Sequence, residues 1–328
     1  MKDVTIDLHL HLDGSVSLCS AKALAKEQGM ILPDDAELLR LLTVGDGCGS
    51  LAEYLEKFDF PLSLLQTEAA IEQATYTLCR ELADEGCIYA EIRFAPQLHT
   101  RAGLTQRDAV AAAVRGLDRS ALDGGIILCC MRGDRNQREN IETVELAEEL
   151  LDRGVVALDL AGNEAGYPNS SFEDIFKTAR DRNIPFTIHA GEADGAESVR
   201  KAIEMGASRI GHGVRSLESP ELIATLAQCG IALELCPTSN VNTAIFDSIG
   251  EYPIRELIAA GVTVTVNSDN RSVSHTTARQ DMHRLRDAGL IDSDTERHLL
   301  INSANAAFCT EEVRQRLIEK IEAAYADK

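Results

Sequence analysis

The chain has 328 residues, enough for one large domain or two smaller ones, and 45% of them are apolar, so a sizeable core can form. A net charge of −21, an aromatic fraction of 4% and the absence of Trp argue against a basic, base-stacking surface for nucleic acid. No apolar run approaches the ~18 residues of a membrane span, and Asp3 and Asp7 interrupt the N-terminal stretch where a secretory signal would lie. We therefore expect a cytoplasmic protein with a small substrate and with no nucleic-acid or membrane partner.

The nine Cys are scattered without any Cys-x-x-Cys spacing. Cys129 and Cys130 are adjacent within an apolar run, which is typical of small buried side chains. In a cytoplasmic protein we expect free thiols rather than disulfides.

Short β-branched runs alternate with longer helical stretches through most of the chain. The predicted strands cover residues 4–10, 88–94, 126–131, 155–160, 186–189, 209–212, 231–235 and 262–267. The predicted helices cover residues 68–85, 106–122, 140–152, 172–182, 196–205, 221–228 and 254–260. A strand-then-helix repeat whose strands are apolar on both faces predicts an α/β fold of the (β/α)₈ TIM-barrel type.

Two segments of the chain are additional to the strand-then-helix repeat of the barrel. Residues of about 18–65, between the first strand and its return helix, contain several helical pieces and predict an insertion where a lid or pocket wall belongs. The tail from Asp294 onward predicts extra helices packed outside the barrel. Because no linker, repeat or low-complexity segment is visible, residues 1–328 are expected to form a single domain.

Histidine residues recur at the predicted strand ends. His9 and His11 end the first strand, where residues two apart share one face at about 7 Å. His189 ends the fifth strand, His212 ends the sixth, and Asp269 follows the eighth. Three imidazoles and a carboxylate suit Zn²⁺ or another borderline first-row divalent ion, with one position left for water. We therefore expect His9, His11, His189 and Asp269 to bind one metal ion.

Glu192 and His212 remain near this group without a metal role. A His beside a metal-activated water can take or orient its proton, and a protonated carboxyl across the substrate can donate one. Other interpretations stay open: His189 as a satisfied core histidine, and Asp269 and Glu192 as helix N-caps. Three further acidic residues close to strand ends receive no role: Asp159, Glu164 and Asp194.

These residues lie in motifs that resemble the adenosine deaminase family, within the metal-dependent amidohydrolase superfamily. The similar segments extend over nearly the whole chain, and they are residues 9–15, 159–164, 189–192, 209–213, 234–240 and 266–270. The resemblance implies one zinc ion per chain, bound by His9, His11, His189 and Asp269. It also implies hydrolytic deamination of adenosine, and of 2′-deoxyadenosine, to inosine and ammonia in purine salvage or catabolism.

The resemblance implies further roles around the purine. Glu192 would protonate N1 while an activated water attacks C6, with His212 and Asp269 managing the protons of that water. Gly162 would offer its backbone N–H to N3, and Asp13 would bind the ribose 5′-hydroxyl. His11 would line the substrate site as well as bind the metal.

Asn270 departs from the family pattern. Many members carry a second Asp there, which contacts purine N7, whereas this chain has the sequence Asp269-Asn270-Arg271. Because N7 is an acceptor, a carboxylate can serve it only when protonated, but an amide donates at any pH. We expect Asn270 to contact the purine.

Alternative functions come from two classes. The substrate could be adenine, AMP or a modified adenine nucleoside, although no Lys/Arg cluster for a phosphate is evident near Asp13 or the strand ends, and free adenine would leave Asp13 without a ribose. A non-catalytic binding protein should have lost Glu192 or His212, and both are present. The His-x-Glu…Pro-Cys-x-x-Cys signature of nucleic-acid deaminases is missing. The oligomeric state is not predicted.

Overall fold

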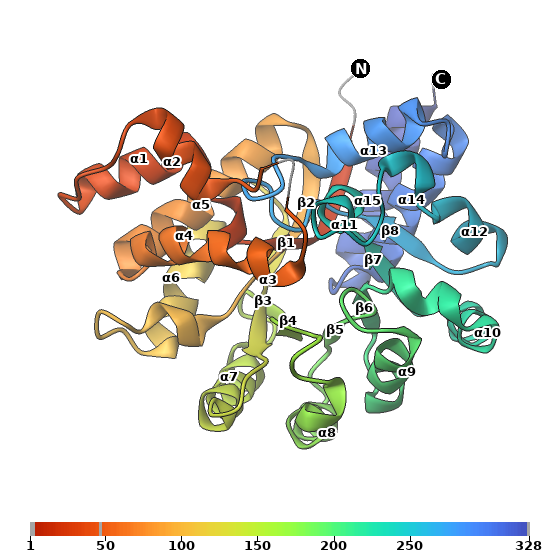
Figure 1. The fold of residues 1–328 in the computed structure, drawn as a ribbon, viewed down its shortest axis with the longest axis horizontal. Helices are drawn as coiled ribbons and strands as arrows, with labels where there is room; N and C mark the ends of the chain where they lie inside the picture. The colour runs from red at the N-terminus through yellow and green to blue at the C-terminus, as the bar shows by residue number, and fades with distance from the viewer. Residues whose placement is uncertain (1–3, 46–47, 327–328) are drawn as a thin grey trace.

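The computed structural model describes residues 4–45 and 48–326 (Figure 1). Every predicted strand is present, with bounds shifted by at most two residues. The strands are β1 (Thr5–His11), β2 (Cys87–Phe94), β3 (Gly124–Met131), β4 (Val155–Ala161), β5 (Thr187–Ala190), β6 (Arg209–His212), β7 (Ala232–Leu235) and β8 (Val264–Val266).

The strands close into a barrel. All pairings are parallel, in the order β1-β2-β3-β4 and β5-β6-β7-β8. Two single bridges join these halves: Leu158 of β4 pairs with Phe186 just before β5, and Leu10 of β1 pairs with Asp269 just after β8. The predicted TIM-barrel fold is therefore confirmed, and the carboxyl ends of all these strands meet at one face.

Helices surround the barrel and return the chain from each strand to the next (Figure 1). The return helices are α5 (Glu68–Asp84), α6 (Gln106–Asp118), α7 (Gln137–Leu150), α8 (Glu173–Asp181), α9 (Ala196–Met205), α10 (Pro220–Cys229), α12 (Ile254–Ala259) and α13 (Ala278–Asp287). Helix α6 ends four residues earlier than predicted, because Ser120 Oγ donates to the carbonyl of Leu117 and accepts from the N–H of Leu122, which favours a turn.

The predicted insertion between β1 and α5 is helical. It contains α1 (Leu18–Glu27), α2 (Asp35–Leu42), α3 (Leu51–Leu55) and α4 (Asp59–Leu64), and residues 46–47 lie outside the described residues. Short 3₁₀ turns and one further helix lie in the loops: η1 (Asp13–Ser15), η2 (Glu56–Phe58), η3 (Pro96–His99), η4 (Asn169–Phe172), η5 (Val214–Glu218), α11 (Pro237–Asn242) and η6 (Ile249–Glu251).

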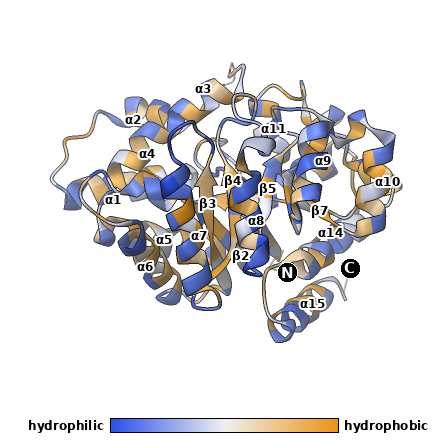
Figure 2. Cartoon of the chain, turned by 90° about the horizontal axis from the view of Figure 1, so that it is seen from below, coloured by the Kyte–Doolittle hydropathy of each residue, from blue (hydrophilic) through white to orange (hydrophobic). Residues whose placement is uncertain are grey.

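The C-terminal helices pack outside the barrel as predicted. Figure 2 shows α15 (Glu311–Tyr325) at the opposite end of the molecule from α3. The segment between α14 (Ser293–Ala306) and α15 contacts the amino-terminal end of the barrel, where Phe308 N–H donates to Glu91 Oε1 at 2.5 Å and Arg209 donates to the carbonyl of Ala306. Across the described part of the chain, no helix combines the length and apolarity that a membrane crossing requires.

Candidate active site

The four predicted metal ligands lie together at the carboxyl ends of the strands. One side-chain N or O atom from each of His9, His11, His189 and Asp269 lies within 4.8 Å of the others. The Nε2 atoms of His11 and His189 are 3.3 Å apart, and Asp269 Oδ1 is 3.5 Å from Nε2 of both His9 and His11. Residues 260 positions apart in the sequence thus form one compact group, because β1 and β8 are neighbours in the closed barrel.

The backbone holds Asp269 against β1. The Asp269 N–H donates to the carbonyl of His9 at 2.7 Å, and the His11 N–H donates to the carbonyl of Asp269 at 2.8 Å. Asp269 has a φ of +60° and His212 a φ of +59°, a left-handed conformation that is uncommon for residues other than Gly. Such strained conformations persist where the surrounding structure enforces them, and they cluster at functional sites.

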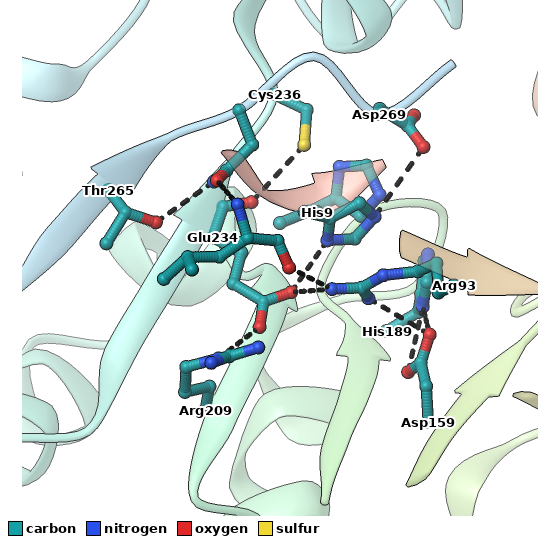
Figure 3. Close-up of polar contacts among 12 residues, drawn as sticks. His9, Arg93, Asp159, His189, Arg209, Glu234, Cys236, Thr265 and Asp269 are labelled. Atoms are coloured by element: carbon teal, nitrogen blue, oxygen red, sulfur yellow. Dashed lines mark hydrogen bonds and ion pairs between the residues drawn. The ribbon is translucent and has the colours of Figure 1, made fainter. Parts of the chain in front are cut away.

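Two buried carboxylates orient the imidazole rings of the group (Figure 3). His9 Nδ1 lies 2.7 Å from Glu234 Oε2, and His189 Nδ1 lies 2.9 Å from Asp159 Oδ2. With Nδ1 engaged, each ring directs Nε2 toward the other ligands. Burial, followed by the charge of Arg93, lowers the pKa of His9 and favours its neutral form, which is the form that binds metal.

An arginine joins the two orienting carboxylates. Arg93 donates to Asp159 at 3.0 Å and to Glu234 at 2.8 Å, and Arg209 donates to the other oxygen of Glu234 at 2.6 Å. Burial alone would raise the pKa of Glu234, but Arg93 and Arg209 bring it down to about 2. This role of Asp159, Glu234 and Arg93 was not predicted from the sequence. The sequence feature that could have indicated this role is that all three charged residues stand in strands that are otherwise apolar.

Glu192 and His212 lie side by side next to the ligand group. His212 Nε2 is 3.6 Å from Glu192 Oε2, and its Nδ1 is 3.1 Å from the amide nitrogen of Asn240. Burial, followed by the charges of Asp269 and Glu164, raises the pKa of Glu192 well above its usual value. This environment favours the protonated form of the Glu192 carboxyl, which is the form that can donate a hydrogen bond.

Glu192 and Asp269 are not the N-cap residues of the helices that follow them. The N-cap residue of α9 is Gly195, and that of α13 is Thr277, whose side chain accepts from Gln280 N–H. The N-cap interpretations of Glu192 and Asp269 are therefore wrong.

The residues expected to bind substrate line one cavity of about 310 Å³. His11, Asp13, Gly162, Glu192 and Asn270 all contribute to its wall. The volume lies at the lower end of the range of ligand pockets, about 300–1,000 Å³. The insertion supplies much of the apolar wall through Leu51, Tyr54, Leu55, Phe58 and Leu62.

Asn270 lies between the ligand group and the start of the insertion. Its Nδ2 donates to Asp269 Oδ1 at 2.7 Å, which uses one of its two amide hydrogens. A Cβ at Gly14 would meet Asn270 Oδ1 at 1.9 Å, so the position of Asn270 depends on the glycine. Nearby, burial raises the pKa of Asp13 to about 6.

Two arginines in the cavity wall were not anticipated from the sequence. Arg132, directly after β3, donates to the carbonyls of Tyr167 and His189 and to Asn169 Oδ1, so both its terminal nitrogens are engaged. Arg101 lines the cavity with an exposed side chain. A single exposed arginine is a weaker signal for a phosphate than the cluster that AMP would require.

A second set of potential metal ligands shares two residues with the first set. His9, His212, Cys236 and Asp269 also lie within 4.8 Å of one another. Burial raises the pKa of the Cys236 thiol well above its usual value, and its Sγ–H donates to the carbonyl of Glu234 at 3.4 Å. Because the thiolate is the form that binds metal, the grouping with His11 and His189 is favoured.

A TIM barrel with two His from its first strand, one from its fifth and an Asp after its eighth defines a metal-dependent hydrolase of the amidohydrolase type. The family model described as adenosine deaminase matches residues 5–324. The chain belongs to the adenosine deaminase family.

Individual relatives agree with this assignment. An adenosine deaminase from Haemophilus ducreyi is 44% identical over 330 residues, which cover 98% of this chain and 96% of the relative. Among solved structures, the adenine deaminase of Arthrobacter aurescens superposes with a TM-score of 0.89 at 24% identity, covering 99% of both chains. An amidohydrolase from Burkholderia ambifaria with bound Zn has a TM-score of 0.87 at 19% identity, covering 99% of this chain and 93% of that structure. At these identities the two structures establish the fold alone.

Proposed function

We propose that the protein catalyses the hydrolytic deamination of adenosine, and of 2′-deoxyadenosine, to inosine and ammonia with one zinc ion per chain. The observation that carries the proposal is the buried Glu192 carboxyl, whose pKa burial raises, beside the ligand group in a cavity that Asp13 also lines. The similarity to a relative named adenosine deaminase supports the same substrate.

The ligand group fits a zinc ion. Three imidazole nitrogens and a carboxylate match the donors that zinc takes in catalytic sites. His9 Nε2 is buried without a hydrogen-bond partner among the described residues, and a metal would satisfy it. When bound, zinc would lower the pKa of a water molecule toward neutrality and so supply a nucleophile at pH 7. The zinc in the structural relative from Burkholderia ambifaria supports this choice of metal.

The chain's own residues would prepare the purine for attack. Glu192 would donate its proton to N1, which makes C6 electrophilic, and His212 beside it would orient or accept a proton of the attacking water. Gly162 would donate its N–H to N3, and the second amide hydrogen of Asn270 would reach N7. The buried Asp13 carboxyl would bind the ribose 5′-hydroxyl.

A substrate panel tests the proposal. The purified protein, loaded with Zn²⁺, is incubated with adenosine, 2′-deoxyadenosine, adenine and AMP, and ammonia release is measured for each. We expect turnover of both nucleosides and roughly 5- to 150-fold lower kcat/KM for adenine and AMP, because a missing polar contact costs on the order of 1–3 kcal/mol. Faster turnover of adenine than of adenosine would contradict the proposed role of Asp13 in binding the ribose. Faster turnover of AMP than of adenosine would instead implicate Arg101 in phosphate binding.

A further inference from the structure

The Glu164 carboxylate holds the turn that carries Glu192. Glu164 lies in the loop after β4, with 1% of its surface exposed. It accepts hydrogen bonds from four consecutive backbone N–H groups after β5, those of Gly191 (2.7 Å), Glu192 (3.0 Å), Ala193 (2.7 Å) and Asp194 (3.0 Å). One side chain therefore determines the path of the backbone on both sides of Glu192.

A fifth donor completes the set. Ser198 Oγ donates to Glu164 Oε1 at 2.5 Å, and it accepts from Asn169 Nδ2 at 3.0 Å. Asn169 is held in turn by Arg132, at 2.7 Å. Accepting five hydrogen bonds suits an ionised carboxylate, which is an acceptor only. These bonds offset the cost of burying the carboxylate.

The backbone after β5 is shaped for this contact. Gly191 has a φ of +70°, and a Cβ there would meet Val199 Cγ2 at 2.5 Å, so only Gly allows the turn. A left-handed residue in such a turn lets successive N–H groups point to one side, which creates a concave site for an anion. In this protein the anion is the side chain of Glu164.

We propose that Glu164 is a positioning residue that sets the place of Glu192 relative to Gly162. Glu164 and Gly162 are two residues apart in the loop after β4, and both Gly162 and Glu192 line the cavity. One carboxylate thus ties together the two groups that serve N3 and N1 of the purine in the proposed function, on which this inference rests. Glu164 itself is absent from the cavity wall and acts through the backbone.

A double-mutant cycle tests the proposal. In Glu164→Gln an NH2 group replaces one acceptor oxygen and faces the backbone N–H donors, so these hydrogen bonds are lost and Glu192 is displaced. A displacement of about 1 Å costs on the order of 100-fold in rate. We expect kcat to fall about 10- to 100-fold while KM changes less than about 3-fold. In a Glu192→Gln background the same change should cost less than about 3-fold, because the group it positions is already inactive. The matched control Glu173→Gln alters an exposed glutamate of α8 and should leave kcat unchanged.

A measurement independent of activity accompanies the kinetics. Backbone amides 191–194 should exchange with solvent deuterium faster in Glu164→Gln than in the wild type, while the zinc content stays the same. If Glu164→Gln does not fold, Ser198→Ala removes one donor and should lower kcat about 2- to 10-fold, again only when Glu192 is present.

Equal losses of kcat in the Glu192 and Glu192→Gln backgrounds, or unchanged exchange at residues 191–194, would overturn the proposal. A wild-type protein that does not deaminate adenosine would contradict the proposed function instead, and amide exchange would still report whether Glu164 holds the turn.

Discussion

At the scale of single residues, the site separates carboxyl groups by their protonation. Burial raises the pKa of Glu192, whereas Arg93 and Arg209 outweigh the effect of burial at Glu234. The surroundings therefore favour the protonated form of Glu192, which faces the cavity, and the ionised form of Glu234, which orients His9. Both residues are glutamates, so their different pKa values result from their surroundings and not from the residue type.

Glu192 should be the proton donor. Replacing Glu192 with Gln keeps its size but removes the transferable proton, so kcat should fall at least about 100-fold while substrate binding is largely kept. In the wild type, kcat/KM should hold at neutral pH and decline as the pH rises through the raised pKa of Glu192, because only the protonated form donates. Steady-state kinetics across pH measure both effects. The exposed control Glu197→Gln should behave as the wild type, and near-normal turnover of Glu192→Gln would place the donor elsewhere.

Asn270 should read N7 of the purine. Its Nδ2 spends one hydrogen on Asp269 and has a second for the substrate. With 7-deazaadenosine, which carries C–H at this position, kcat/KM should fall roughly 5- to 150-fold, the cost of an unmet buried donor. In Asn270→Ala, kcat/KM for adenosine should fall by a similar factor and the penalty on the analogue should shrink. An equal penalty in both proteins would mean that Asn270 only supports Asp269.

At the scale of elements, the strands carry charge into the barrel interior. Arg93 on β2, Asp159 on β4, Arg209 on β6 and Glu234 on β7 join in one buried network behind the ligands (Figure 3). These four side chains are buried inside the ring of return helices, so each charge needs a partner. The network thereby fixes the orientation of His9 and His189.

Removing an orienting carboxylate should weaken metal binding. In Glu234→Gln, His9 loses its charged partner, and such changes behind a metal site typically cost 10- to 100-fold in affinity, that is, about 1–3 kcal/mol. Competition with a chromogenic chelator measures the zinc affinity. Asp159→Asn should act similarly through His189, whereas Glu256→Gln on the exposed face of α12 should have no effect. Unchanged affinity in both network variants would mean that the network serves folding alone.

At the scale of the whole molecule, the four candidate metal ligands come from both halves of the barrel. His9 and His11 belong to β1, His189 belongs to β5 in the other four-stranded sheet, and Asp269 follows β8. A metal ion bound here would link strands on opposite sides of the barrel. The C-terminal segment around Phe308 contacts the opposite end, at Glu91.

Metal removal should destabilise the entire fold. Zinc at about 100 times its Kd contributes on the order of 2.7 kcal/mol, which corresponds to a shift of several degrees in Tm. Calorimetry of the chelated and zinc-restored protein measures this shift. A single transition in both states would agree with the prediction of one domain, whereas two separate transitions, or an unchanged Tm, would contradict these expectations.

Much of the fold and the ligand group could be predicted from local patterns. The alternation of strands and helices predicted the barrel, because apolar runs and turn residues report the local period of the chain. The His residues at strand ends predicted that the candidate ligands lie together, because parallel strands all end at one face. The cytoplasmic location and the roles of the site residues stay predictions.

Only the tertiary structure decided which polar groups meet. Glu234 orients His9 from 225 residues away, and Glu164 reaches the N–H groups after β5 from 27 to 30 residues away. The local pattern places a charged residue on a strand or in a loop, but its partner depends on how the barrel closes and on the register of its strands. For this reason the sequence by itself determined the barrel and its histidines. The pairing of buried charges, the raised pKa of Glu192 and the hydrogen bonds of Glu164 were decided in three dimensions, where burial and distance control the electrostatic energy.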